Sequence, residues 1–85
     1  MKELLKFTAP WCKACKAMSA LLEATPLKDC ELKEIDVDDS ENQDLATKYG
    51  IRSLPTMVLL KDGEEVERFI GATPVNKLQE SINNF

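Results

Sequence analysis

Residues 3–24 read ELLKFTAPWCKACKAMSALLEA, and this stretch decides the fold. Residues 3–8 carry nearly continuous apolar side chains, a density that is typical of a strand covered on both faces. The sequence Ala-Pro-Trp at 9–11 breaks this strand. From Cys12 to Ala24 the apolar residues return at helical spacing. The stretch therefore predicts a buried strand that leads into a helix, with a cysteine at the junction.

Two further elements are expected in the middle of the chain. Residues 31–37 alternate apolar and polar side chains, which predicts a second strand. Ser40 and Gln43 form a capping-box pattern, in which Ser40 accepts a hydrogen bond from a backbone amide and Gln43 reaches back. Gly50 is a natural C-terminal cap, so we expect a short helix between Ser40 and Gly50.

The last third of the chain predicts a pair of strands. Residues 56–60 are the most apolar segment of the chain, and the Asp-Gly pair at 62–63 is a strong hairpin signal. Residues 64–70 form the returning strand, in which we expect Phe69 and Ile70 to face inward.

A final helix completes the element order. Thr73 and Pro74 are a good N-cap and first-turn pair for it. The order is then strand, helix, strand, helix, strand, strand, helix. The first strand–helix–strand unit should be right-handed with parallel strands, and the last two strands antiparallel. We therefore expect residues 1–85 to form one α/β domain, a mixed four-stranded sheet with helices on both faces.

Composition excludes several classes of function. The 15 acidic and 11 basic residues give a net charge of −4, which argues against a surface that binds nucleic acid. No apolar run approaches the ~20 residues of a membrane span, and the charged N-terminus does not resemble a signal peptide. Three cysteines, an odd number, do not form a disulfide framework. We therefore expect a cytoplasmic protein in which a close cysteine pair is catalytic or metal-binding.

The spacing of Cys12 and Cys15 has a physical reason. Two intervening residues, wound into a first helical turn, bring the sulfurs close enough to bond and to separate again. Cys12 would face unpaired backbone amides and the positive end of the helix dipole, and both favour a thiolate. Lys13 and Lys16 add positive charge nearby. Cys15, one turn further on, should be more buried and less ionised.

Two other interpretations of this cysteine pair have weaker support. A zinc site would need two more ligands, but only Cys30 and carboxylates remain and the chain has no histidine. A purely structural disulfide between Cys12 and Cys15 would close so small a loop that it would constrain the unfolded chain little. We expect Cys30 to be a small buried or half-buried filler.

Three separate motifs resemble the thioredoxin family. Residues 9–16, APWCKACK, are similar to the active-site segment of thioredoxins and protein disulfide isomerases. Residues 49–56, YGIRSLPT, are similar to the thioredoxin segment around its cis-proline, and 61–63 and 71–72 match its hairpin and following loop. The resemblance implies a thioredoxin fold with strand order 2-1-3-4. By this resemblance, the chain corresponds to a minimal thioredoxin without the N-terminal strand and helix of ordinary thioredoxins. The diglycine segment typical of glutathione-binding glutaredoxins is absent from the sequence.

The resemblance implies roles for individual residues. Cys12 would attack a substrate disulfide, and Cys15 would resolve the mixed disulfide. Pro55 would be cis and face the sulfurs, although the chain pattern without the resemblance favours a trans proline at the start of a strand. The Leu54 backbone would pair with the substrate peptide. The expected substrate-binding surface comprises Trp11, Lys13, Leu54, Pro55, Gly71 and Ala72.

The chain departs from the family beneath the cysteines. Lys6 stands where thioredoxins carry a buried aspartate, and Glu34 stands where a lysine commonly pairs with it. Adjacent strands lie ~4.8 Å apart, so Lys6 and Glu34 can meet. Our hypothesis is that the pair is present with its charges exchanged, and that Glu34 or a neutral Lys6 handles the proton of Cys15. Alternatively, Lys6 reaches the surface along its aliphatic stem.

The expected function is thiol–disulfide exchange. The chain would reduce protein disulfides, with ribonucleotide reductase as one plausible target by resemblance, and a thioredoxin reductase would reduce it again. It would work as a monomer without a bound cofactor or metal. One alternative is a glutaredoxin-like enzyme that uses glutathione. Another is a non-catalytic binding subunit with the same fold.

Overall fold

The computed structural model describes residues 1–85 and contains one four-stranded sheet with the strand order β2-β1-β3-β4. This order and the mixed pairing confirm the predicted fold. Strands β1 and β2 are parallel, whereas β3 is antiparallel to both β1 and β4. The elements are β1 (Lys2–Thr8), α1 (Lys13–Ala24), β2 (Glu31–Asp36), the 3₁₀ turn η1 (Ser40–Asn42), α2 (Gln43–Lys48), β3 (Thr56–Lys61), β4 (Glu64–Ile70) and α3 (Val75–Asn84).

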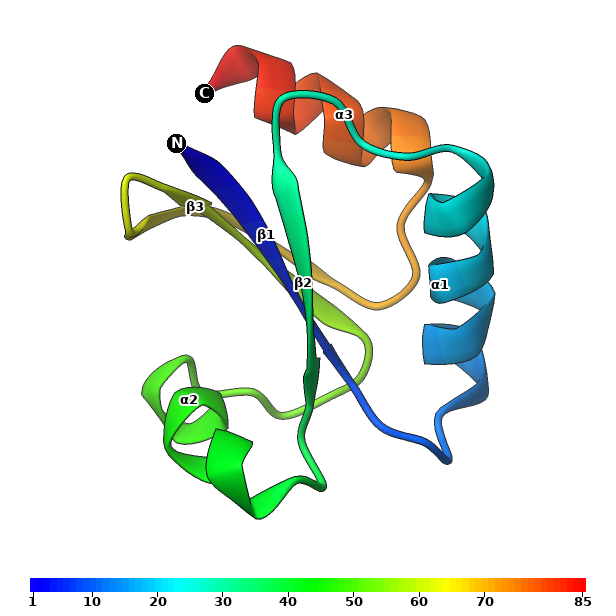
Figure 1. The fold of residues 1–85 in the computed structure, drawn as a ribbon, viewed down its shortest axis with the longest axis vertical. Helices are drawn as coiled ribbons and strands as arrows, with labels where there is room; N and C mark the ends of the chain where they lie inside the picture. The colour runs from blue at the N-terminus through cyan, green and yellow to red at the C-terminus, as the bar shows by residue number, and fades with distance from the viewer.

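Helices cover both faces of the sheet (Figure 1). Helices α1 and α3 lie on one face, over a core of eight buried side chains that includes Leu4, Met18 and Leu78. Helix α2 lies on the other face, where Leu45 and Tyr49 pack against Leu5, Phe7 and other buried strand residues. Alternate side chains of β1 therefore enter different cores, which explains its unbroken apolar sequence.

Strand β1 also buries a charged residue. Residues Leu4 to Phe7 are all buried, and the exposed fraction of Lys6 is 0%. Lys6 lies on the same face of β1 as Leu4, because side chains two residues apart share a face. Its ammonium group therefore enters the layer between the sheet and α1.

The start of the short helix differs from the prediction. Asp39, not Ser40, caps η1, since the Asp39 carboxylate accepts a hydrogen bond from the amide of Glu41 at 2.9 Å. The side chain of Gln43 donates to the carbonyl oxygen of Val37 at 2.9 Å instead of reaching back to a helix amide. Aspartate and serine are both good N-cap residues, and the negative charge of Asp39 also interacts favourably with the helix dipole.

Two predictions near the C-terminus were also wrong. Pro74, not Thr73, is the N-cap of α3, and the Thr73 hydroxyl donates instead to the carbonyl oxygen of Gly71 at 3.1 Å. Ile70 is 70% exposed, whereas Phe69 is buried, because successive side chains of a strand point to opposite faces. The predicted hairpin is confirmed, with φ of 52° at Asp62 and 86° at Gly63.

Candidate active site

The two cysteines of the predicted pair are joined at the start of α1. Cys12 and Cys15 form a disulfide with a Cα–Cα distance of 5.3 Å. Cys12 is the N-cap of α1, and its sulfur accepts a hydrogen bond from the amide of Cys15 at 3.1 Å. Once the disulfide is reduced, the same amide and the helix dipole favour the thiolate of Cys12.

A tight turn places Cys12 just below the molecular surface, with Cys15 beneath it. The amide of Cys12 donates to the carbonyl oxygen of Ala9 at 3.1 Å, and the amide of Lys16 donates to that of Cys12 at 3.2 Å. Cys12 retains 7% exposure, whereas Cys15 is fully buried. No acidic residue lies in the first turn of α1, and Lys13 and Lys16 are exposed there. An incoming disulfide therefore meets Cys12 first, in a positively charged setting.

The proline segment is tied to the loop after β4. The Leu54–Pro55 peptide bond is cis, as the resemblance implies. The amide of Gly71 donates to the carbonyl oxygen of Pro55 at 2.8 Å, and Gly71 has a φ of +88°, a conformation that suits glycine. The chain thus holds Pro55 and Gly71 side by side, although they are 16 positions apart in the sequence numbering.

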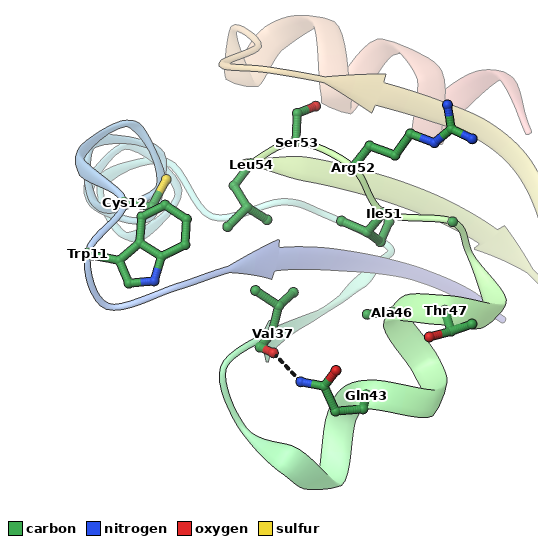
Figure 2. A pocket seen from close by; sticks show the side chains of 11 residues that line it. Trp11, Cys12, Val37, Gln43, Ala46, Thr47, Ile51, Arg52, Ser53 and Leu54 are labelled. Carbon is green, nitrogen blue, oxygen red and sulfur yellow. Dashed lines mark hydrogen bonds between the residues drawn. The ribbon is translucent and has the colours of Figure 1, made fainter.

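A groove of about 600 Å³ opens beside Cys12 (Figure 2). Figure 2 shows Trp11 and Cys12 on one side and Leu54 opposite, with Val37 below. The helix α2 and the segment after it supply the rest of the lining, which includes Ile51 and Arg52. We call this hollow the groove. Its walls are partly apolar, and Cys12 is one of its lining residues.

The indole of Trp11 is held in place by a contact that the sequence did not predict. Trp11 is 68% exposed, and its Nε1 donates to the carboxylate of Asp38 at 2.8 Å. The two residues lie 27 positions apart and are brought together by the loop after β2. Sequence alone gave no signal for this bond beyond the run of aspartates in that loop.

The other expected binding residues do not all line the groove. Trp11, Cys12 and Leu54 do, whereas Lys13 lies outside its lining. Ala72 is exposed and lines a separate hollow with Met18 and Leu21.

Lys6 and Glu34 meet, as the charge-exchange hypothesis requires. They are partners in the β1–β2 register, and their Nζ and Oε1 atoms lie 3.3 Å apart. Ser19 of α1 contacts both, with its Oγ 2.8 Å from Lys6 Nζ and 2.7 Å from Glu34 Oε1. The alternative, in which Lys6 reaches the surface, is wrong because its side chain is 0% exposed.

The carboxylate of Glu34 is stabilised in its charged form. The hydrogen bond from Ser19, followed by the charge of Lys6 and its hydrogen bond, holds the pKa of Glu34 below its ordinary value of 4.5, although partial burial acts in the opposite direction. Glu34 and Ser19 also line a second hollow with Lys16, Glu23 and Asp36, which we call the side recess. The sequence predicted the pair but not Ser19, whose only signal is that it follows Cys15 by four residues.

The remaining titratable candidates lie apart from this site. Cys30 is half-buried against the core beneath α1 and α3, and burial is the main cause that raises the pKa of its thiol. No group of three or more histidine, cysteine, aspartate or glutamate side chains is placed to hold a metal ion. No helix has the length and apolar character needed to cross a membrane.

Comparisons with known proteins agree with this geometry. The family model described as Thioredoxin matches residues 1–84. The thioredoxin of Bacillus subtilis is 44% identical over 81 residues, which cover 94% of this chain and 78% of that protein. The thioredoxin of Rickettsia bellii is 39% identical over 83 residues, which cover 95% of this chain and 78% of that protein.

Solved structures give the same result. A thioredoxin variant from Halobacterium salinarum superposes with a TM-score of 0.88 at 38% identity, covering 99% of this chain and 74% of that one. The oxidised mitochondrial thioredoxin 3 of Saccharomyces cerevisiae superposes with a TM-score of 0.78 at 35% identity, covering 99% of this chain and 78% of that one. The chain therefore belongs to the thioredoxin family and is a protein thiol–disulfide oxidoreductase whose redox pair is Cys12 and Cys15.

Proposed function

We propose that the chain reduces disulfides in other proteins, with Cys12 as the nucleophile. The Cys12 thiolate attacks one sulfur of the substrate disulfide, forms a mixed disulfide and releases the other substrate sulfur as a thiolate. The observation that carries this assignment is the position of Cys12 at the N-cap of α1, with the amide of Cys15 on its sulfur at 3.1 Å.

Cys15 then resolves the mixed disulfide. Its thiolate attacks the sulfur of Cys12, the second substrate thiolate leaves, and two electrons have passed from the enzyme to the substrate. The product is the Cys12–Cys15 disulfide. Cys15 is fully buried, so an external disulfide cannot reach it before it reaches Cys12, and this suits Cys15 to the second step.

The substrate would lie along the surface around Pro55. The Leu54 backbone would pair with the substrate chain, because the segment before β3 borders the groove next to Cys12. Trp11 would cover one side of the bound peptide. Gly71, which is hydrogen-bonded to Pro55, would continue this surface on the other side with Ala72, and Lys13 would contribute charge at its edge.

We further propose that the Lys6–Glu34 pair handles the proton of Cys15. A thiol must lose its proton before it attacks. Lys6 and Cys15 are both fully buried, and Lys6 bonds to Ser19 on the helix that carries Cys15. A Lys6→Met variant should therefore change both the titration of Cys15 and the rate of the resolving step.

A thioredoxin reductase is the electron donor that fits the family, with glutathione as the less favoured alternative. We propose that residues 1–85 work as one domain and as a monomer in the cytoplasm. Ribonucleotide reductase is a candidate substrate on the family resemblance alone. Comparing the rate at which thioredoxin reductase and glutathione each reduce the oxidised protein would separate the two donors.

Trapping of the mixed disulfide tests the proposed function. A reduced Cys15→Ser variant, incubated with a disulfide-containing protein, should accumulate a covalent complex that dithiothreitol dissolves. Cys12→Ser should form none, and Cys30→Ser should turn over like the wild type. A complex that forms with Cys12→Ser, or a wild type that leaves the substrate disulfide intact, would contradict the assignment. Full biological activity of a Cys12→Ser, Cys15→Ser double variant would favour a non-catalytic role.

A further inference from the structure

We propose that Ser19 is a positioning residue that holds Lys6 and Glu34 together against the redox helix and thereby helps the pair to handle the proton of Cys15. This inference rests on the proposed role of the Lys6–Glu34 pair. It goes beyond that role because it assigns a function to a serine on the same helix as the two cysteines.

The direction of each hydrogen bond follows from the groups involved. An ammonium group only donates and a carboxylate only accepts. Ser19 Oγ therefore accepts from Lys6 Nζ at 2.8 Å and donates its single proton to Glu34 Oε1 at 2.7 Å. The direct contact between Lys6 Nζ and Glu34 Oε1 is longer, at 3.3 Å. The hydroxyl is therefore the closer partner of both charges, and each of its two hydrogen bonds is charge-assisted.

Ser19 is also the side chain that links the ion pair to the redox helix. It follows Cys15 by four residues, so the two side chains lie on the same face of α1. The other partner of Lys6, Glu34, belongs to β2 and is 46% exposed. Without the Ser19 hydroxyl, no side chain of α1 would bond to the buried ammonium group.

Ser19 and Glu34 are the two side chains that bond to the Lys6 ammonium group. On the β3 side, the register partner of Lys6 is the apolar Met57. The charged groups around Ser19 and Glu34 are Lys16 and Glu23 from α1 and Asp36 from β2, all of which line the side recess. None of these three forms an ion pair within 4.0 Å.

Removal of the hydroxyl should therefore slow the resolving step. The Lys6 ammonium would lose its closest acceptor and the Glu34 carboxylate its closest donor, so the pair would be held less firmly against α1, the helix that carries Cys15. We expect Ser19→Ala to slow the attack by Cys15 on Cys12 about three- to tenfold at neutral pH, because the rate follows the thiolate fraction.

The resolving step can be timed directly in a Cys30→Ser background. Reduced protein is mixed with 5,5′-dithiobis(2-nitrobenzoate), which attaches thionitrobenzoate to Cys12. The second release of thionitrobenzoate then reports the attack by Cys15, and its pH profile gives the titration of Cys15. Ser19→Ala should move this profile to higher pH. Ser19→Thr, which keeps a hydroxyl, should restore it. Ser40→Ala, at an exposed serine without a side-chain hydrogen bond, should leave the profile unchanged.

A double-variant cycle with Lys6→Met identifies the route of the effect. If Ser19 acts through Lys6, Ser19→Ala should shift the wild-type profile but not the Lys6→Met profile. An equal shift in both backgrounds would overturn the inference, as would a wild-type profile that Ser19→Ala leaves in place. A Lys6→Met variant whose profile matches the wild type would refute the proposed role of the pair itself. The exchange activity of Cys12 would stand in either case.

Discussion

Lys6 and Glu34 are direct partners across β1 and β2, yet one side chain is fully buried and the other is 46% exposed. The two side chains therefore differ in how far they depend on protein groups, and not water, as hydrogen-bond partners. Glu34 retains access to water if its partner is removed, whereas Lys6 does not.

This asymmetry predicts opposite sensitivities to substitution. Glu34→Ala should lower the free energy of unfolding by about 1–3 kcal/mol, because it leaves a buried ammonium group with Ser19 as its remaining partner. Lys6→Met should stay within about 1 kcal/mol of the wild type, because it replaces a buried charge by an apolar side chain of similar volume. Urea unfolding of the oxidised proteins measures both values, and a larger loss for Lys6→Met would contradict the prediction.

The contribution of the Glu34 carboxylate to the stability of the oxidised protein should be lost at acidic pH. The pKa of Glu34 in the folded chain lies below its ordinary value of 4.5, so the unfolded chain binds the proton more readily. The stabilisation is fully present above about pH 5 and is lost as the pH falls through the folded pKa. The stability difference between the wild type and Glu34→Gln should therefore be constant at neutral pH and shrink below pH 4.5. A difference that grows on acidification would show the wrong sign.

Alkylation should distinguish Cys12 from Cys30. In a Cys15→Ser, Cys30→Ser variant, the rate of reaction of Cys12 with iodoacetamide should have its midpoint below about pH 8.5, the value for a free cysteine. In a Cys12→Ser, Cys15→Ser variant the midpoint for Cys30 should lie above that value, because burial raises the pKa of its thiol. A midpoint for Cys12 above that for Cys30 would contradict the claim that the start of α1 stabilises the Cys12 thiolate.

The bond between Trp11 and Asp38 should matter for protein substrates more than for small ones. Asp38→Ala frees the indole, so the fluorescence anisotropy of Trp11, the single tryptophan, should fall. The KM for a protein disulfide should rise about two- to tenfold, the range expected for one hydrogen bond. The reaction with a small aromatic disulfide should not change. Glu41→Gln, which removes a charge from η1 without touching Trp11, is the matched control.

Features with a local cause could be predicted from the sequence. The strand that contains Lys6 was recognisable from its apolar density. The contact with Glu34 followed from the expected pairing of two neighbouring parallel strands. The hairpin at Asp62 was predictable because its two turn residues, Asp62 and Gly63, are of types that adopt positive φ readily.

Features that arise from competition or from distant contacts could not be predicted. Asp39 and Ser40 are adjacent residues that can both cap a helix, and only the path of the chain after β2 decides between them. Ser19 is an ordinary serine in an amphipathic helix until the sheet places two charges against it. The partner of Trp11 lies 27 positions away and depends on a loop without regular structure.

The groove and the side recess share no lining residue. Under the proposed function, the residues that would contact a bound substrate in the groove differ from those that surround the carboxylate of Glu34. Substitutions at Ile51 or Arg52 would then change which proteins are reduced and leave the contacts of Ser19 with Lys6 and Glu34 intact.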